Sequence, residues 1–523
     1  MAENSEQQPE PIRVITDEDR SKANDEFLKY SAKDFWKDLY IGSGNRLPED
    51  GRRNILITAA LPYVNNVPHL GNIIGSTLSG DVFARYCRSR SYNVLFVSGT
   101  DEYGTATENK AQEEKLTPKE ICDKYHKIHS DVYKWFKLSF DHFGRTTTEK
   151  QTKIAQDIFW NVHKNDYILQ EDIEQLFCGN CEKFLADRFV EGICPFCAYE
   201  DARGDQCDQC GKLINAVELK SPRCKTCSKT PHIKTSKHLF IDLPKIQDKL
   251  EIFKDEQLES GRWSNTAKVI TNSWFKDGLK ARCITRDLKW GTQVPLEGFQ
   301  DKVFYVWFDA PIGYISITAN LINDWEKWWK NPDQVELHHF IGKDNVPFHS
   351  IIFPATQLCT GEKWTPGANI SATEYLNYED TKFSKSRGIG VFGDTAESTG
   401  IVADIWRFYL LYIRPENQDT TFSWSDLLNK NNSELTNNLG NFVNRALMFL
   451  SKNFDSTVPE LILNDIDKDL FVLINDQITK YIEFMENIKL KDALRVILNI
   501  TRLGNQYMQN EAPWNAIKSE ETK

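Results

Sequence analysis

The order of apolar and polar positions in the first half of the chain predicts alternating strands and helices. Residues 54–60 form a short apolar run rich in β-branched side chains, which suits a buried parallel strand. A turn-rich stretch follows, then a helical pattern through about Arg90, and residues 92–101 resemble a second strand that ends in a polar loop. Strand, helix and strand in this order is typical of an α/β fold with a doubly wound parallel sheet.

The pattern changes twice further along the chain. From about 170 to 235, Gly, Cys, Lys and Asp dominate and apolar periodicity is lost, which predicts an inserted module. The α/β pattern resumes near Thr285, and residues 303–308 and 337–342 are predicted strands. From about Val402 the pattern is helical, and four segments fit the 3.6-residue period: 403–414, 429–453, 468–486 and 492–510.

The start of the chain is polar and charged, and residues 1–50 predict a partly helical extension. Its aromatic side chains are expected to dock on the body: Phe27, Tyr30, Phe35, Trp36 and Tyr40. The acid-rich first twenty residues resemble neither a secretory signal nor a transit peptide, and the sequence contains no long uncharged apolar run. We therefore predict a cytoplasmic protein with no membrane span.

Length and charge narrow the possible classes of function. A chain of 523 residues predicts about three domains at roughly 100–200 residues each. The net charge of −11 argues against bulk, non-specific binding of nucleic acid, although it leaves room for a local basic surface.

Eight of the twelve cysteines are clustered, which indicates metal binding rather than disulfides. They form four Cys-x-x-Cys units: Cys178/Cys181, Cys194/Cys197, Cys207/Cys210 and Cys224/Cys227. Each unit can supply two thiolates to a tetrahedral Zn²⁺, so the set suits two structural four-cysteine sites. The spacing allows adjacent pairing of the units, first with second, and also nested pairing, first with fourth. The other cysteines are predicted core residues: Cys87, Cys122, Cys283 and Cys359.

The first candidate chemical site is the string His69-Leu70-Gly71-Asn72, between the first predicted strand and the first helix. Ligands of open parallel sheets bind beyond the carboxyl ends of strands, and a helix amino terminus attracts phosphate. Gly71 is expected to allow close approach of a nucleotide, while His69 and Asn72 donate hydrogen bonds to phosphate oxygens. Alone, the string fits equally well a helix start with a structural histidine.

The second candidate site is Lys382-Phe383-Ser384-Lys385-Ser386, in the turn-rich stretch 380–393. Two lysines flanking a small hydroxyl residue suit a polyphosphate, and nearby glycines would let the loop close. Alone, this string also fits a solvated surface loop.

Together, the two strings resemble the signatures of class I aminoacyl-tRNA synthetases, usually His-Ile-Gly-His and Lys-Met-Ser-Lys-Ser. Asn72 replaces the final histidine and Phe383 replaces methionine; the asparagine keeps a hydrogen-bond donor, and neither change removes a charged contact. Further segments between about residues 53 and 514 resemble methionyl-tRNA synthetases: 60–63, 99–104, 307–314 and 341–349.

The resemblance implies a methionine pocket. Its residues would be Leu61, Tyr63, Trp307, Ala310, Pro311, Tyr314 and His349, with Asp101 holding the substrate amino group. Aromatic rings suit a thioether, since a sulfur–aromatic contact contributes about 0.3–1.5 kcal/mol, and a carboxylate matches an ammonium. Trp307 and Tyr314 alone would fit an ordinary core, but the Pro and Gly that follow Trp307 favour a crevice.

The implied activity is that of a methionine-tRNA ligase. L-Methionine and ATP would give methionyl-adenylate and pyrophosphate, and the methionyl group would pass to the 3′ end of tRNA(Met), including the initiator. Catalysis of this kind is positioning plus stabilisation of phosphate charge. The resemblance assigns it to His69, Asn72, Lys382, Lys385 and Arg286, with Gly71 and Ser384 in the ATP site and Mg²⁺ bound with ATP. Arg286 alone would also fit a surface ion pair with Asp287.

Two further expectations depend on the resemblance. It favours nested zinc pairing, since single-zinc relatives retain the inner units. It also implies that Asn441, Arg445 and Trp514 read the CAU anticodon, by stacking and by hydrogen bonds to splayed bases. Without the resemblance, these residues fit a helix cap, a surface arginine and a docking tryptophan. Association with other synthetases or with a tRNA-binding cofactor protein is left open.

These expectations divide the chain into six parts. They are an N-terminal extension (1–50), two halves of a Rossmann-type catalytic domain (51–165 and 285–375), an inserted zinc-knuckle domain (166–284), a linker domain with the Lys-Phe-Ser-Lys-Ser loop (376–430) and an α-helical anticodon-binding bundle (431–523). Two alternatives compete. The aromatic pocket and small insertion argue against a cysteine, leucine, isoleucine or valine enzyme, and intact His69, Lys382 and Lys385 argue against an inactive zinc-ribbon RNA-binding relative.

Overall fold

The computed structural model describes residues 13–31, 47–185, 189–204, 207, 209–210, 214–379, 390–459 and 461–518. The chain divides into two compact units, which are considered separately. The larger unit is Gly42–Ser423, and the smaller unit combines Met1–Ile41 with Trp424–Lys523.

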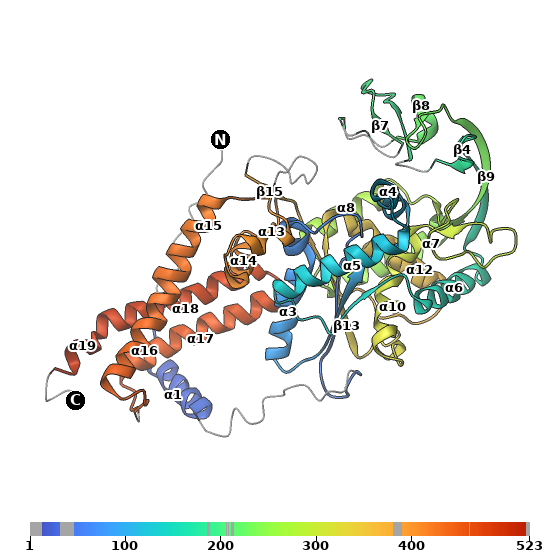
Figure 1. Ribbon diagram of the computed structural model, residues 1–523. Helices are drawn as coiled ribbons and strands as arrows, with labels where there is room; N and C mark the ends of the chain where they lie inside the picture. The colour runs from blue at the N-terminus through green and yellow to red at the C-terminus, as the bar shows by residue number, and fades with distance from the viewer. Residues whose placement is uncertain are drawn as a thin grey trace. The chain divides into compact units, whose positions relative to one another are not determined.

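The centre of the larger unit is a parallel sheet of five strands, in the order β14-β13-β1-β2-β3. Its strand β13 is labelled in Figure 1. The strands are β1 (Asn54–Ala59), β2 (Asn93–Thr100), β3 (His142–Arg145), β13 (Val335–Gly342) and β14 (Asn369–Thr373). From β1 the chain builds outward to β2 and β3 on one side, and later to β13 and β14 on the other. The predicted doubly wound α/β sheet is therefore confirmed, and its strand order reverses beside β1, where such sheets bind ligands.

Helices formed by the alternating pattern pack on this sheet. The helix after β1 begins as α2 (Leu70–Asn72), continues as a π-helical turn, η2 (Ile73–Thr77), and ends as α3 (Leu78–Ser89). Other helices of this body are α5 (Pro118–Trp135), α6 (Glu149–Lys164) and α12 (Phe353–Cys359). Helix α10 (Ile312–Leu321) is buried from Ile312 to Ala319 and carries Tyr314 of the site described below.

The predicted strand over residues 303–308 is wrong beyond its first two residues. β12 covers only Val303–Phe304 and pairs with β11 (Thr285–Arg286). The chain then turns into α9 (Val306–Asp309), where the amide of Ala310 donates to the carbonyl of Val306 at 3.1 Å. Aromatic and β-branched residues favour strands in isolation, but β12 finds only a short partner strand, and the following proline begins the next helix.

The cysteine-rich segment is carried by a long antiparallel ribbon of β4 (Ile168–Cys178) and β9 (His232–Ile241). The segment that joins these two strands in the sequence forms a small sheet in the order β7-β6-β8, made by β6 (Val190–Ile193), β7 (Ala202–Arg203) and β8 (Lys220–Cys224). Figure 1 labels β7 and β8. After β9 the chain forms α7 (Leu243–Ser260) and α8 (Asn265–Lys276), and it rejoins the body at β10 (Arg282–Cys283).

Several further elements belong to the larger unit. They are α4 (Thr105–Glu114), α11 (Glu326–Trp329), η5 (Lys343–Asn345), η6 (Phe348–Ile352), β15 (Leu376–Tyr378), α13 (Gly393–Ser398), α14 (Ala403–Tyr412) and β16 (Thr420–Phe422). Of the four cysteines predicted in the core, Cys87, Cys122 and Cys359 are buried. Cys283 is only half-buried, because the two-residue strand β10 pairs on one side only, with β9.

The smaller unit is helical, as predicted. It contains α15 (Trp424–Lys430), η8 (Asn431–Gly440), α16 (Asn441–Asn453), α17 (Asp465–Glu486), α18 (Leu490–Glu511) and α19 (Pro513–Ala516). The N-terminal helix α1 (Asp17–Ser31) packs on α17, where the Phe27 ring lies 5.1 Å from that of Phe471. Docking of Phe27 is therefore confirmed. The side chains of Tyr30, Phe35, Trp36 and Tyr40 lie outside the described residues. Nowhere in the described chain is a helix both long and apolar enough to cross a bilayer.

Candidate functional site

A cavity of about 560 Å³ lies beside the carboxyl ends of β1, β2 and β13. Ten of the predicted substrate residues line it: Leu61, Tyr63, His69, Gly71, Asn72, Asp101, Ala310, Pro311, Tyr314 and His349. They come from five separate stretches of sequence, and the sheet brings them to one place. Lys382, Ser384 and Lys385 lie outside the described residues.

His69 closes the start of α2 in a reciprocal cap. Its Nδ1 accepts a hydrogen bond from the Gly71 amide at 3.1 Å, and its own amide donates to Oδ1 of Asn72 at 3.2 Å. Desolvation lowers the pKa of His69, so the ring is neutral and carries its proton on Nε2. A Cβ at position 71 would lie only 2.9 Å from Cε1 of His69. A residue larger than glycine would therefore clash with the imidazole where the ring lies over the start of the helix.

Asp101 follows β2 and is fully enclosed at the edge of the cavity. Its amide donates to the carbonyl of Pro62 at 2.9 Å. Burial, together with the charge of neighbouring Glu102, raises the pKa of Asp101 to about 7. Burial has removed the water that would stabilise the charged form of this carboxylate. A cation that enters the cavity would therefore stabilise the ionised carboxylate strongly.

Glu102 anchors the end of the same strand from behind. It is completely buried, and its carboxylate accepts hydrogen bonds from Nε of Arg145 at 3.0 and 2.9 Å and from Oγ1 of Thr100 at 2.9 Å. Its carbonyl accepts from Nε1 of Trp290 at 2.7 Å. These bonds hold the backbone next to Asp101 in one geometry.

A chain of polar side chains ends the cavity on the far side. The hydroxyl of Tyr314 lies 2.9 Å from Nε2 of His349, whose Nδ1 lies 2.8 Å from the carbonyl of Asn345. Because a carbonyl only accepts, Nδ1 of His349 carries the proton and Nε2 accepts from Tyr314. Burial lowers the pKa of His349 to about 4, so this neutral tautomer persists at pH 7. Tyr314 and His349 therefore give this part of the cavity an uncharged polar surface.

Trp307 and Arg286 lie at a second cavity of about 170 Å³ rather than in the first. The two cavities share Tyr63 and Asn65 in their walls. Trp307 packs against Phe348, a wall residue of the larger cavity, with ring centroids 4.6 Å apart. Asp287, which follows Arg286 in the chain, pairs with His238 at 2.9 Å and with Lys302.

Several wall residues of the larger cavity were not among the predicted site residues. Asn345 fixes the tautomer of His349, and it lies inside a segment that carried the family resemblance, so its position was available from the sequence. The backbones of Phe392 and His69 form an isolated antiparallel β-bridge. The hydroxyl of Tyr375 donates to Oδ1 of Asp344 at 2.7 Å. Phe392 and Tyr375 stand in ordinary loop sequence on either side of the Lys-Phe-Ser-Lys-Ser string, and no local pattern indicates them.

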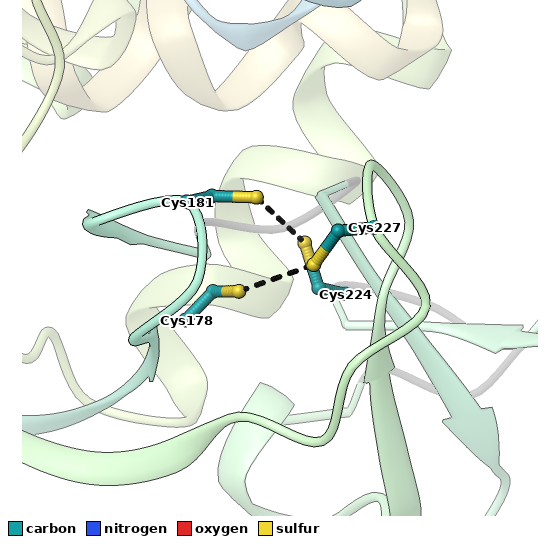
Figure 2. Close-up of side chains that lie close together, drawn as sticks. All are labelled: Cys178, Cys181, Cys224 and Cys227. Carbon is teal, nitrogen blue, oxygen red and sulfur yellow. Dashed lines mark hydrogen bonds between the residues drawn. The ribbon is translucent and has the colours of Figure 1, made fainter.

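The clustered cysteines gather into two groups of four, as nested pairing requires. One group is Cys178, Cys181, Cys224 and Cys227 (Figure 2), and the other is Cys194, Cys197, Cys207 and Cys210. Within each group all sulfurs lie within 4.8 Å of one another. Pairs of sulfurs are 3.5 to 4.0 Å apart, far beyond the disulfide length of about 2.05 Å.

The sulfur geometry fits a tetrahedral metal. Zinc–sulfur bonds of about 2.3 Å in a tetrahedron place sulfurs about 3.8 Å apart. The observed 3.5 Å between Cys178 and Cys227 and 4.0 Å between Cys181 and Cys224 lie on either side of this value. Each group is formed entirely by thiols, with no position left for water, so both groups could hold zinc in a structural role.

The predicted RNA-reading residues form a cluster within the smaller unit. The guanidinium of Arg445 lies 4.9 Å from the centre of the Trp514 ring, and Nδ2 of Asn441 donates to Oδ1 of Asn505 at 3.0 Å. Asn441 and Arg445 both stand on α16, one turn apart, and every residue of this helix is at least partly exposed. An arginine stacked on a tryptophan at an exposed surface is a platform on which a nucleic-acid base can stack.

Comparison with known families now places the chain. The parallel sheet has the start of a helix at its switch point, where such sheets bind ligands. The family model for "tRNA synthetases class I (M)" matches residues 55–447, and that for "Anticodon binding domain of methionyl tRNA ligase" matches residues 458–523. The chain belongs to the family of class I tRNA synthetases (M).

Relatives and solved structures agree with this placement. The chain is 64% identical over 472 residues to "Methionine--tRNA ligase, cytoplasmic" of Xenopus laevis, covering 90% of this chain and 52% of that one. It is 63% identical to the Homo sapiens protein of the same name, covering 91% and 53%. The chain thus spans about half the length of the curated relatives it matches. Its fold resembles Mycobacterium tuberculosis methionyl-tRNA synthetase in complex with methionyl-adenylate, with a TM-score of 0.73, 23% identity and coverage of 90% of this chain and 86% of that one.

Proposed function

We propose that this chain is a methionine-tRNA ligase that acts in the cytoplasm. It activates L-methionine with ATP, releases pyrophosphate, and transfers the methionyl group to the 3′ end of tRNA(Met). The observation that carries the proposal is the larger cavity. One space contains the helix start at His69, which suits phosphate, the buried carboxylate of Asp101, and the aromatic side chains of Tyr63 and Tyr314. The cytoplasmic relatives named above support both the activity and the location.

The proposed roles of the predicted residues follow from the geometry of the cavity where the residues are described, and otherwise from the family resemblance. Asp101 binds the substrate ammonium, while Leu61, Tyr63, Ala310 and Pro311 surround the side chain. Tyr314 and His349 meet the sulfur, and Trp307 closes the pocket through Phe348. On the nucleotide side, Nε2 of His69 and Nδ2 of Asn72 donate to ATP phosphates beside Gly71, and Arg286 faces the reacting carboxylate. Lys382, Ser384 and Lys385 complete the phosphate site with Mg²⁺.

We further propose that both cysteine groups hold structural zinc, since their donors and spacings fit that ion. The six-part division of the chain is proposed on the same basis, with residues 51–165 and 285–375 forming the catalytic domain around the shared sheet. Asn441, Arg445 and Trp514 would read the anticodon. Association with other synthetases or with a tRNA-binding cofactor protein belongs to the same proposal.

The activity is tested by ATP–pyrophosphate exchange with each standard amino acid in turn. We expect exchange with methionine alone, and a Lys385→Ala variant should lose it, because one cation of the phosphate site is removed. Exchange with leucine, isoleucine, valine or cysteine would replace the methionine assignment and keep the class. If folded, zinc-loaded protein exchanged with no amino acid, the proposal would be wrong and an inactive RNA-binding role would stand.

Substitutions at the proposed anticodon platform should separate the two half-reactions. Arg445→Ala is expected to lower kcat/KM for tRNA by about 10- to 100-fold while exchange with methionine stays unchanged, because stacking and hydrogen bonds to a base contribute about 1–3 kcal/mol each. Aminoacylation kinetics with a tRNA(Met) transcript measure the loss. Arg495→Ala is the matched control, an exposed arginine of the same unit that pairs with Asp492 at 3.0 Å. Equal losses in both variants would contradict the assignment.

A further inference from the structure

Asp287, the residue after Arg286, is the centre of a buried polar network. Its Oδ2 lies 2.9 Å from Nε2 of His238 and accepts a hydrogen bond from Nε2 of Gln175 at 2.9 Å. Its Oδ1 accepts from Nζ of Lys302. Because a carboxylate only accepts, Nε2 of His238 carries a proton. One carboxylate therefore ties together β4, β9 and the residue that precedes β12.

The charges of this network lie almost entirely out of water. The side chain of Lys302 is 7% exposed, that of Asp287 is 11% exposed, and that of His238 is 0% exposed. Burial alone would raise the pKa of Asp287, but hydrogen bonds from His238 and Lys302 lower it below its ordinary value, so the carboxylate is ionised. Nζ of Lys302 also donates to Oγ of Ser236 at 3.0 Å. The buried cation and anion are thus paired, and each has a further hydrogen-bond partner.

Apolar packing of the cysteine-rich segment reaches the same place. The buried apolar cluster of that segment also contains Leu288 and Val303. Leu288 lies two residues after Arg286 in the chain, and Val303 is the cross-strand partner of Arg286 in the β11–β12 pair. The backbone that carries Arg286 is therefore packed against this segment as well as bonded to the ribbon.

The guanidinium of Arg286 is the group that these contacts place. It lies 3.5 Å from the centre of the Tyr305 ring, and its Nη1 donates to the carbonyl of Thr285 at 3.0 Å. Oγ1 of Thr285 lies 2.9 Å from Nδ1 of His238 and accepts from the amide of Leu239 at 3.1 Å. The residues on both sides of Arg286 are therefore bonded to β9.

A buried ion pair of this kind is poorly explained by stability alone. Removing both charges from water costs about as much free energy as their attraction returns, and well-packed apolar residues often stabilise a fold equally well. What such a network provides is a single geometry, the one in which every hydrogen bond is made. We propose that Asp287, His238 and Lys302 are positioning residues that hold Arg286 at the reacting carboxylate during methionine activation. This inference rests on the proposed function, which places Arg286 there.

The position of this arginine matters most in the transition state. The methionine carboxylate oxygen bonds to the α-phosphorus of ATP while the bond to pyrophosphate breaks, and a guanidinium stabilises the charge on the phosphate oxygens only from a fixed position. A displacement of about 1 Å can lower a rate about 100-fold. The walls of the methionine pocket belong to other stretches of the chain, so loss of the network should lower kcat and leave KM for methionine nearly unchanged.

Replacing the ion pair with apolar side chains gives the first test. Lys302→Met/Asp287→Leu leaves neither charge of the pair without its partner, so we expect a folded chain that binds as much zinc as the unaltered chain. In methionine-dependent pyrophosphate exchange, kcat should nevertheless fall about 10- to 100-fold, with KM for methionine within about twofold. His238→Leu, which keeps the ion pair and removes the bonds to Thr285 and Asp287, should have the same kind of effect. Lys237→Met, at an exposed position of β9, is the matched control and should change neither constant.

A double-mutant cycle with Arg286 gives the second test, because it identifies the group through which the network acts. Arg286→Ala alone should lower kcat, and adding Lys302→Met/Asp287→Leu should lower it no further, since no guanidinium is left to misplace. Equal losses in the presence and absence of Arg286 would overturn the inference. So would exchange at the unaltered rate in both Lys302→Met/Asp287→Leu and His238→Leu. Absence of methionine exchange in the unaltered chain would instead overturn the proposed function, and this inference with it.

Discussion

Replacing Asp101 with asparagine is expected to lower kcat/KM for methionine by about 10²- to 10³-fold in pyrophosphate exchange. The variant keeps the volume of the side chain and loses its charge, so the substrate ammonium would enter a closed site without its partner. Removing one member of a buried ion pair typically costs about 3–5 kcal/mol. The matched control is Asp301→Asn, at an exposed loop position, which should leave exchange unchanged.

The same substitution should alter the pH dependence. Burial raises the pKa of Asp101 to about 7, so in the free protein the carboxylate is ionised above that pH and protonated below it. We therefore expect kcat/KM for methionine to fall as pH drops below about 7, by up to tenfold per unit. The bound ammonium stabilises the carboxylate, so kcat should be less sensitive to acid than kcat/KM. An acid limb that persists unchanged in Asp101→Asn would assign the titration to another group.

The position of this carboxylate could be predicted from the sequence, and its environment could not. Asp101 directly follows a strongly apolar strand, and strand ends in a parallel sheet meet at one edge. The support behind it comes from Glu102, Arg145 and Trp290, which converge from distant parts of the sequence. No local pattern reports such a convergence, because it depends on how β3 and the loop before β12 pack after the sheet forms.

Local propensity was misleading where tertiary contacts decide the backbone. Residues 303–308 carry the aromatic and β-branched side chains of a strand, but only Val303–Phe304 find a partner strand. The turn into α9 places Tyr305 under Arg286 and moves Trp307 to the second cavity. The second cavity itself joins residues 103–106, 286–288 and 304–307, and their proximity could not be predicted from spacing along the chain.

The cysteine spacing predicted the number of metal sites but not their composition. Four Cys-x-x-Cys units permit either adjacent or nested pairing. In both cases the segment between the paired units is short enough for them to share one metal ion. The structure brings Cys178 at the end of β4 close to Cys227, just after β8, with a sulfur distance of 3.5 Å. The inner units are then left to meet each other in the loop between β6 and the 3₁₀ turn η4 (Ala216–Glu218). The path of the ribbon, rather than the spacing, therefore determines the grouping.

Zinc content should follow this grouping in paired substitutions. The unaltered chain is expected to bind two zinc ions, and Cys207→Ser or Cys224→Ser alone should leave one. The double variant C207S/C224S should bind none, because it damages both nested sites, whereas C194S/C207S damages one site and should retain one. Adjacent pairing predicts the reverse for these two double variants. Metal content is measured after dialysis against a weak chelator, with Cys283→Ser as the control that should still bind two.

Loss of the outer site should have the larger structural effect. Structural zinc in small domains contributes about 10–16 kcal/mol to folding, far more than a single apolar contact in the cysteine-rich segment. The outer group closes the whole segment from Cys178 to Cys227, including the inner group, while the inner group closes only the loop from Cys194 to Cys210. Limited proteolysis should therefore cut Cys224→Ser throughout 178–227 and Cys207→Ser mainly within 194–210. Identical cleavage patterns would show that the two sites fold as one unit, and the nested hierarchy of stability would be wrong.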